Sequence, residues 1–383
     1  MNRSSSIGGP HRDVLVVGGG PAGLVTAIAT RLEGLSVTVV DRTCPPIDKA
    51  CGEGLMPHGV ARLRAYGVDL EGAGIPFRGV RYIEESLLAE GRFRGAPGLG
   101  VRRTTLQRRL VGRASELGAE LRWNTPVRAL SRDGVDTDRG PIRARWVVGA
   151  DGLHSSIRRW TGLARQTRGR PRYGIVRHFG LRPWADLVEV YWAHGAEAYV
   201  TPLGEQEVGV ALLIDGKGHM DRRGDAGTAF DAWLARFPAL HSRLQGAAPV
   251  CADRGAGPLH QRVRAVCRDR VLLVGDASGY LDAVTGEGLT LAIVQAAALA
   301  RAVAGDDPAR YAAEHRRIGA TAWSITRWLL RLKRARWARH RLILGFERDP
   351  ATFDRCLDAL GGDPQHGAAA VGTLGLAWRL VRA

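Results

Sequence analysis

Apolar residues near the N-terminus occur in the order expected for a strand, a helix and a second strand. Val14–Val17 is a short apolar run that ends at a glycine, which predicts a buried parallel strand. Residues 21–33 have helical periodicity, and Gly34 is placed to end that helix. Ser36–Val40 is a second apolar run, and it ends at Asp41. This spacing predicts the start of a βαβ unit packed into about thirty residues.

Later apolar patterns predict further helices and strands of two kinds. Arg102–Leu117 has one apolar stripe and 289–304 is rich in small apolar residues, so both predict helices. Arg143–Gly149 and Val271–Val274 predict buried strands, each leading into a turn with glycine and aspartate. Residues 173–214 contain short alternating runs rich in Val, Tyr and Trp, which predict a largely antiparallel sheet. The pattern is that of a nucleotide-binding domain interrupted by a sheet domain and followed by a helical, basic stretch.

The chain has 383 residues and a formal net charge of +17, which raises the question of a nucleic-acid partner. The positive charge is almost all arginine, it is spread through every region, and no nucleic-acid-binding signature accompanies it. These observations favour a compositional origin of the charge and no nucleic-acid partner. The sequence does not indicate the oligomeric state.

The five cysteines form no Cys-x-x-Cys pair and no cluster with histidine, so no metal site is expected. Such a scattered set suits reduced thiols in a cytoplasm. The first 13 residues are polar and lack the apolar core of a signal peptide. The chain has no clean run of about 18 apolar residues, so a membrane-spanning helix is not expected. We therefore expect a cytoplasmic protein.

A glycine-rich turn, Gly18–Gly23, joins the first strand to the first helix in the pattern G-x-G-x-x-G. Gly18 permits the tight turn, Gly20 lets the backbone approach a pyrophosphate, and Gly23 lets the helix pack on the sheet. The helix N-terminus offers amide donors to phosphates, and Asp41 is placed to bind a ribose diol. The motif predicts a bound dinucleotide without separating FAD from NAD. The contacts expected from this region are Gly18, Gly20, Pro21, Ala22, Gly23, Asp41 and Arg42.

Two further strand ends carry aspartate and glycine together, at the edge where open α/β sheets bind ligands. Asp151 lies in 149–158, and Asp276 lies in 275–282. Asp276 is placed to bind a ribityl hydroxyl, and the amides of 286–289 to stabilise negative charge on a cofactor ring. For either aspartate alone, a turn or a helix cap is the alternative. The candidates in these two motifs are Asp151, Asp276, Gly286, Gly288 and Leu289.

Taken in order, the three motifs resemble the FAD-binding framework of group A flavoprotein monooxygenases, geranylgeranyl reductases and flavin-dependent halogenases. The resemblance covers about residues 12–305. It implies an α/β fold, with a Rossmann-like three-layer FAD-binding domain, an inserted, mostly antiparallel substrate sheet and a helical C-terminal region. It also implies bound FAD, with NADPH or NADH as the reductant. Arg103 would lie near the cofactor, although a surface position is an equal alternative for that side chain.

The resemblance also implies how the chain divides into domains. The FAD-binding domain would comprise 1–72, 98–170 and 251–309, the substrate-binding sheet domain 73–97 and 171–250, and the helical region 310–383.

Details of the motifs separate the branches of this superfamily. Residues 49–57 and Thr285–Gly288 resemble the reductases. Aromatic hydroxylases usually have a histidine and an asparagine where this chain has Ser278–Gly279 and Leu289, and both branches usually have a proline where Ala283 stands. The Trp-x-Trp-x-Ile-Pro segment of halogenases does not occur, so halogenation is the least favoured reaction.

The substrate side offers three candidate catalytic side chains. His178 and His194 are candidates for deprotonating a phenol, since histidine titrates near neutrality, with a structural or surface role as the alternative. By resemblance to the reductases, Cys51 lines the pocket, with a buried inert thiol as the alternative.

Residues 316–341 contain tryptophans among arginines and no acidic residue. They predict a helix packed on the core, which is favoured, or a peripheral contact with an anionic membrane.

Two enzyme functions remain open from the sequence. The favoured one is an NAD(P)H- and O2-dependent monooxygenase that hydroxylates an aromatic or polyketide-derived small molecule through a flavin C4a-hydroperoxide. The alternative is a flavin-dependent reductase of C=C bonds in an isoprenoid or lipid-like substrate. A third reading, from another class, is a nucleotide-binding protein without catalytic activity.

Overall fold

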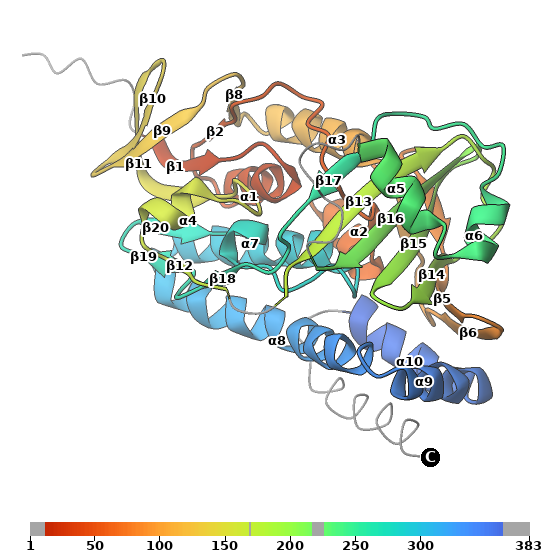
Figure 1. Cartoon of the computed structure of the whole chain (residues 1–383). Helices are drawn as coiled ribbons and strands as arrows, with labels where there is room; N and C mark the ends of the chain where they lie inside the picture. The colour runs from red at the N-terminus through yellow and green to blue at the C-terminus, as the bar shows by residue number, and fades with distance from the viewer. Residues whose placement is uncertain (1–11, 168–169, 217–225, 363–383) are drawn as a thin grey trace, which may run out of the picture.

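Two β-sheets with surrounding helices form the core of the computed structural model, which describes residues 12–167, 170–216 and 226–362 (Figure 1). β1 (Arg12–Val17), α1 (Pro21–Leu32) and β2 (Val37–Val40) form the predicted βαβ start. β1 and β2 run parallel, with Val14 opposite Val37. The strands, the helices and their order confirm the predicted α/β class.

The first sheet has the strand order β19-β20-β11-β1-β2-β8, and β9 and β10 join it through β11. From β20 to β8 the neighbouring strands are parallel. The three predicted motifs follow β1, β11 and β20, so they meet at one edge of this sheet. The strands not yet given are β8 (Glu120–Arg122), β9 (Val127–Ser131), β10 (Gly134–Thr137), β11 (Gly140–Gly149), β19 (Cys267–Arg268) and β20 (Val271–Leu273).

Different layers cover the two faces of the first sheet. One face packs against α1 and four other helices through an apolar cluster that includes Leu24, Ile28 and Leu299. The other face packs through Leu15 and Val147 against the hairpin of β9 and β10 and against α4. This gives the three-layer arrangement expected from the sequence. The helices not yet given are α2 (Pro57–Ala65), α3 (Arg103–Glu116), α4 (Ser156–Trp160), α7 (Gly288–Ala304) and α8 (Pro308–Leu332).

The second sheet has the order β17-β13-β16-β15-β14-β5-β6 and is antiparallel except where β14 meets β5. One of its faces is covered by α5 and α6, with Phe230 and Leu240 in the contact. A small sheet of β3, β7 and β4 lies in the chain segment that precedes α3. The remaining strands are β3 (Gly54–Leu55), β4 (Ile75–Phe77), β5 (Gly79–Glu84), β6 (Leu87–Arg92), β7 (Gly98–Gly100), β12 (Ala164–Arg165), β13 (Arg172–Phe179), β14 (Val188–Ala193), β15 (Ala196–Gly204), β16 (Glu207–Asp215), β17 (Arg254–Ala256) and β18 (Arg262–Val263). The helices are α5 (Ala226–Leu234) and α6 (Pro238–Arg243).

One strand lies outside the domain to which the sequence assigned it. β17 falls within 251–309, which was assigned to the FAD-binding domain, yet it pairs with β13 at the edge of the second sheet. The chain therefore returns to the first sheet only after Ala256. The domain boundaries as a whole stay a prediction.

The C-terminal helices α8, α9 (Arg336–Arg348) and α10 (Pro350–Gly361) follow one another along one side of the molecule (Figure 1). The helix predicted over 316–341 is interrupted, because α8 ends at Leu332 and α9 begins at Arg336. Leu329 and Leu332 are buried in an apolar cluster with α9, α10 and the second sheet, which agrees with the favoured packing role. Residues 363–383 of the predicted helical region lie outside the described part of the chain.

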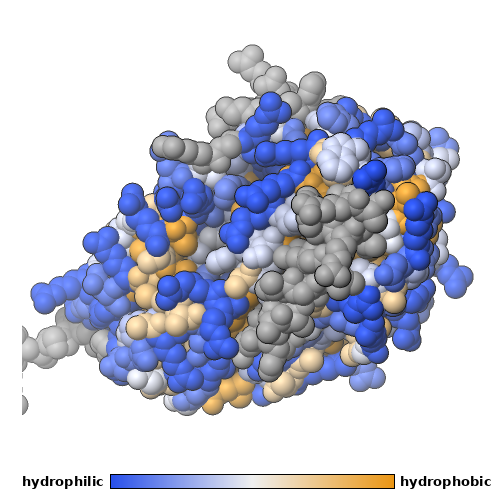
Figure 2. Space-filling model, turned by 90° about the horizontal axis from the view of Figure 1, so that it is seen from below, coloured by the Kyte–Doolittle hydropathy of each residue, from blue (hydrophilic) through white to orange (hydrophobic). Residues whose placement is uncertain are grey.

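The face on the side of these helices is largely hydrophilic around small apolar patches (Figure 2). Trp337 in α9 is 62% exposed, and the same helix carries several arginines. No helix in the described ranges is long and apolar enough to cross a membrane. A peripheral membrane contact of 316–341 stays a prediction.

A buried cluster of charges ties the helical region to the second sheet. Lys333, which caps α8, donates to Glu197 at 2.8 Å and to Asp215 at 2.7 Å. Arg172 on β13 donates to the same two carboxylates, at 2.6 and 2.8 Å. It also lies 2.9 Å from Asp282, in the loop that precedes α7. Two cations and three carboxylates thus join α8, the second sheet and the third motif.

We expect Lys333→Met to destabilise the protein by about 3 kcal/mol, because it leaves buried carboxylates with one cation fewer. Urea unfolding of the two proteins measures this difference. The matched control is Arg334→Met, which removes an exposed cation from the next residue and should change stability by less than about 0.5 kcal/mol. Equal effects of the two substitutions would contradict the role given to the cluster.

Candidate cofactor and substrate site

A cavity of about 1130 Å³ lies where the two sheets meet. Its walls come from the carboxyl ends of β1, β2 and β11, from the start of α7 and from the second sheet. Helices α8 and α10 close its far end with apolar side chains. The cavity exceeds the roughly 300–1000 Å³ of a usual small-molecule pocket, so it has room for a cofactor and a substrate together.

The glycine-rich turn between β1 and α1 forms one end of the cavity. Gly18 has φ +117, and a Cβ there would lie 2.4 Å from the carbonyl oxygen of Ala150. A Cβ on Gly23 would lie 1.8 Å from the carbonyl oxygen of Gly18, so α1 approaches this closely only with glycine. At Gly20 the nearest atom would be a terminal nitrogen of Arg103, at 3.4 Å. Gly18 and Gly20 line the cavity, whereas Gly23 is a packing position outside it.

Asp41 shapes this turn as well as lining the cavity. Its Oδ2 accepts a hydrogen bond from the Gly19 amide at 2.7 Å, and its Oδ1 accepts from the amide and hydroxyl of Thr43. Gln107 donates to the Gly19 carbonyl at 2.7 Å and accepts from the Ile47 amide at 2.6 Å. Sequence analysis missed Gln107, although it lies one helical turn after Arg103 and shares its face. A ribose contact of Asp41 stays a prediction.

Asp151 caps the helix that follows β11. Its Oδ1 accepts from the Ser155 hydroxyl, and its Oδ2 accepts from the amides of Ser156 and Ile157 at 2.6 and 3.2 Å. This is the capping role named as the alternative from the sequence. Asp151 also lines the cavity, so a cofactor contact of this residue stays a prediction.

Arg158 joins the second motif to the third. Its guanidinium donates to the carbonyls of Asp276 and Ala277, both at 3.1 Å, and to that of Leu153 at 2.6 Å. These bonds hold the turn after β20 against the turn after β11. The side chain is buried, so it acts through the backbone of the two turns.

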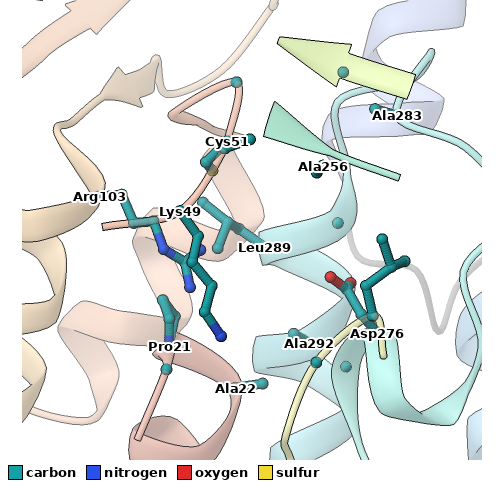
Figure 3. A pocket seen from close by; sticks show the side chains of 18 of the residues that line it. Pro21, Ala22, Lys49, Cys51, Arg103, Ala256, Asp276, Ala283, Leu289 and Ala292 are labelled. Carbon is teal, nitrogen blue, oxygen red and sulfur yellow. The ribbon is translucent and has the colours of Figure 1, made fainter. Parts of the chain in front are cut away.

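Three charged side chains face one another across the cavity. Lys49 and Arg103 point into it from one side and Asp276 from the other (Figure 3). Burial raises the pKa of Asp276, and the two cations oppose that shift. Burial and the neighbouring Arg103 lower the pKa of Lys49. Sequence analysis quoted Lys49 within a motif but gave it no role.

The polar atoms of this region fit a cofactor that carries phosphates and hydroxyls. Within the described part of the chain, the buried Nε of Arg103 has no hydrogen-bond partner. Among the same residues, the carboxylate of Asp276 accepts no hydrogen bond that would compete with a ligand. A buried donor without a partner, such as the Arg103 Nε, is costly unless a ligand satisfies it. Together with the glycine turn, they fit FAD.

The start of α7 forms the middle of the cavity wall. Gly286, Gly288 and Leu289 line the cavity, and Leu289 projects into it (Figure 3). Gly286 has φ +69, a backbone conformation that favours glycine. The free amides of the first helical turn and the helix dipole favour negative charge at this position.

Glu287 lies at this helix N-terminus as its N-cap residue and is 4% exposed. Burial raises its pKa to about 8, so the protonated, neutral form predominates at pH 7. A neutral side chain leaves the positive end of the helix dipole available to a negative charge on a ligand.

The three candidate catalytic side chains fall in three different environments. Cys51 lines the cavity near Leu289 (Figure 3), and burial raises its pKa. His178 is 2% exposed and bonded to Glu53, and it is not part of the cavity lining. His194 lies in the exposed turn between β14 and β15, away from the lining, so it is withdrawn as a candidate base.

The far part of the cavity is an apolar chamber between the second sheet and the C-terminal helices. Tyr199 is among its few polar side chains, and its hydroxyl donates to the carbonyl of Val284 at 2.9 Å. The chamber is lined by Met56, Phe77, Val80, Tyr82, Val176, Val188, Val190, Tyr199, Thr201, Ala211, Leu213, Val284, Leu329, Leu357 and Leu360. None of these side chains is a carboxylate or an imidazole, so the chamber suits an apolar or aromatic substrate.

The fold and the site define a flavin-type oxidoreductase that binds a dinucleotide. The chain belongs to a family described as "FAD binding domain", whose profile matches residues 11–306. This membership confirms the suspected superfamily and supports FAD as the cofactor.

Similar proteins include enzymes of both kinds considered from the sequence. Digeranylgeranylglycerophospholipid reductase 2 of Methanopyrus kandleri is 29% identical over 74% of this chain and 74% of its own length. The 6-methylpretetramide 4-monooxygenase of Streptomyces rimosus is 29% identical over 76% of this chain and 74% of its own. A flavoprotein/dehydrogenase from Cytophaga hutchinsonii has a TM-score of 0.82 at 19% identity, covering 96% of this chain and 98% of its own. That last likeness shows the fold alone.

Two glycine substitutions should separate binding from folding. Gly20→Ala puts a methyl group into the cavity without a backbone clash, so FAD affinity should fall about tenfold or more while the apoprotein keeps its melting temperature. Gly23→Ala meets a backbone carbonyl and should lower stability by about 1–3 kcal/mol. Flavin fluorescence and thermal unfolding measure the two effects. Loss of apoprotein stability in Gly20→Ala would contradict this assignment.

Glu287 should give the protein a measurable pH dependence of stability. Its pKa is near 4.5 when unfolded and about 8 when folded, so the free energy of unfolding falls as pH rises between these values. The slope approaches about 1.4 kcal/mol per pH unit, and Glu287→Gln removes it. Urea unfolding at pH 6 and pH 8 should show that the free energy of unfolding of the variant rises relative to that of the wild type as pH rises. The exposed Glu33→Gln serves as the control, and a pH-independent difference for Glu287→Gln would refute the assignment.

Proposed function

We propose that FAD lies along the cavity, with its pyrophosphate at the amino end of α1 and its ring beside the start of α7. The side chains of Asp276 and Arg103, which the protein leaves partly without hydrogen-bond partners, then bond to polar groups of the cofactor. The amides of the first turn of α7 stabilise negative charge on the ring. The residues proposed to contact FAD are Gly18, Gly20, Pro21, Ala22, Asp41, Arg42, Arg103, Asp151, Asp276, Gly286, Gly288 and Leu289.

We further propose that the protein is a monooxygenase that takes electrons from NADPH or NADH and hydroxylates an aromatic or polyketide-derived small molecule. The observation that carries this proposal is the apolar chamber next to the proposed ring position. Bound FAD supplies the transfer of electrons from the nicotinamide to oxygen. The similarity to a monooxygenase of comparable identity and coverage supports the same reading.

The side chains of the protein position the substrate and exclude water from the reacting atoms. Phe77 and Tyr82 offer ring faces and edges against which an aromatic substrate packs. The aliphatic side chains of α8 and α10 close the chamber and keep water away from the reacting atoms. The residues that line the chamber include no carboxylate or imidazole to deprotonate a phenol, so the substituents of the substrate itself have to make its ring electron-rich.

Oxygen consumption tests the proposal directly. The purified protein should oxidise NADPH or NADH slowly alone and faster with phenols that carry apolar substituents. Substrate-stimulated O2 uptake should match the amount of product with one added oxygen atom, labelled when 18O2 is supplied. Reduction of an alkene without oxygen, with no phenol hydroxylated, would contradict this proposal and favour the second candidate function described below.

The second candidate function is the reduction of a C=C bond in an isoprenoid or lipid-like substrate. Cys51 favours it, because burial raises the pKa of this cavity thiol and keeps its proton available to a carbon of the substrate. The reductase of Methanopyrus kandleri is a relative of equal identity. In that case Cys51→Ala would lower anaerobic alkene reduction about a hundredfold while flavin reduction by the nicotinamide stays unchanged. For a hydroxylase the same variant would keep substrate-coupled O2 uptake.

A further inference from the structure

A cysteine, a histidine and a glutamate form a hydrogen-bonded chain beside the cavity that the proposed function does not use. Cys251 Sγ lies 3.3 Å from Nδ1 of His178, and Nε2 of the same ring lies 2.6 Å from Oε2 of Glu53. The Val250 amide donates to the His178 carbonyl at 2.9 Å, which fixes the cysteine beside β13. The order is that of a nucleophile, a base and an acid that orients the base.

A cation completes the surroundings of the sulfur. Arg102 donates from a terminal nitrogen to Cys251 Sγ at 3.6 Å, and its Nε lies 3.4 Å from Glu207. With Nε2 of His178 donating to Glu53, Nδ1 is left as the acceptor for the thiol proton. The imidazole is within reach to accept the thiol proton as the sulfur attacks, and the guanidinium lies beside the sulfur where negative charge then develops.

Cys251 differs from the other partly exposed cysteines in the side chains that surround its sulfur. It is partly exposed and does not line the cavity, so small reagents reach it without displacing a cofactor. Burial raises the pKa of Cys51, of Cys267 and, to about 12, of Cys356, which makes these three thiols poor nucleophiles. Cys44 is exposed but lies in the cofactor cleft.

We propose that Cys251 is an activated thiol and a site of oxidation by small hydroperoxides. In this step the sulfur attacks one oxygen of hydrogen peroxide, a sulfur–oxygen bond forms and the oxygen–oxygen bond breaks. The sulfur loses two electrons and the peroxide gains them. The departing hydroxide takes the proton that His178 accepted and leaves as water, so the product is a sulfenic acid.

The same chain leads from Cys251 to the cofactor cleft. The second oxygen of the Glu53 carboxylate accepts from the Arg103 amide at 2.7 Å, at the first residue of α3. Glu53 lines the cavity and has φ +57, an unusual backbone conformation for a residue with a side chain. An oxygen atom added to the sulfur crowds His178, shifts Glu53 and thereby moves Arg103. Oxidation of Cys251 therefore alters flavin binding at a distance.

The rate of alkylation tests the activation and does not depend on which reaction the enzyme catalyses. The holoenzyme is treated with iodoacetamide at pH 7, with glutathione as an ordinary thiol, and each cysteine is followed by peptide mass spectrometry. Cys251 should react about tenfold faster than glutathione. His178→Gln keeps an amide donor for Glu53 but offers no base to the thiol, so it should bring the rate down to that of glutathione.

Two results of this experiment would overturn the proposal. One is a wild-type Cys251 that reacts no faster than glutathione. The other is an unchanged rate in His178→Gln, with flavin absorbance and melting temperature showing that the variant is folded. Should His178→Gln fail to fold, Arg102→Gln replaces it, because losing the cation beside the sulfur should slow the alkylation about threefold or more.

Peroxide treatment tests the modification and its connection to the cofactor. After exposure of the holoenzyme to hydrogen peroxide, a sulfenic-acid trap such as dimedone should label Cys251. The oxidised protein should also bind FAD about threefold or more weakly. Cys251→Ser should show neither change. A folded wild type without label at Cys251 refutes the oxidation site, and label without any change in flavin affinity refutes the connection through Glu53.

Discussion

The cofactor site depends on a backbone-to-backbone contact that no side chain can enter. The turn after β1 meets the turn after β11 so closely that a Cβ on Gly18 would lie 2.4 Å from a carbonyl oxygen of Ala150. The same turn meets α1 at Gly23 with even less space. These approaches bring the amide groups of the α1 N-terminus to the edge where three parallel strands end. Arg158 then adds the turn after β20 to the same edge through three carbonyl contacts.

A second constraint is electrostatic and holds the substrate side in place. Arg172 and Lys333 share the carboxylates of Glu197, which is buried, and Asp215, whose side chain is 32% exposed, and Arg172 also reaches the buried Asp282. Removing one member of this set leaves a buried charge without its partner, which is costly. Because Asp282 belongs to the loop before α7, the position of the C-terminal helices is linked to that of the proposed flavin contact. Backbone contact thus sets the cofactor side of the cavity, and a charge network sets the substrate side.

The pattern of apolar residues was sufficient to predict the parallel strands β1, β2, β11 and β20, the antiparallel second sheet and the helices α1, α3 and α7. It worked because buried strands and small-residue helices have periods that local sequence displays, as in Val14–Val17 and 289–304. The spacing of glycines and aspartates was sufficient to indicate the cofactor edge for a similar reason. Short stretches such as β17 were misassigned because their pairing is decided by strands far away in the sequence.

The substrate side was harder to predict because its contacts are long-range. His194 was named as a candidate base from its residue type alone. Its position in the exposed turn between β14 and β15, which rules it out, became visible only in the structure. At the cofactor edge too, Gln107 and Arg158 donate to carbonyls of Gly19 and Asp276, and partners this far away in the sequence could not be inferred from the motifs around the two donors. The apolar chamber draws Leu329, Leu357 and Leu360 from helices at the opposite end of the chain from the glycine turn.

The chamber and the glycine turn are thus built from different parts of the chain, and this has a consequence for how such an enzyme diversifies. The side chains that close the chamber belong to α8 and α10, which add no residue to the glycine turn. Replacement of a leucine on these helices would therefore reshape the proposed substrate chamber without altering the residues proposed to bind the nucleotide. Selectivity and electron transfer are free to evolve as separate modules of one polypeptide.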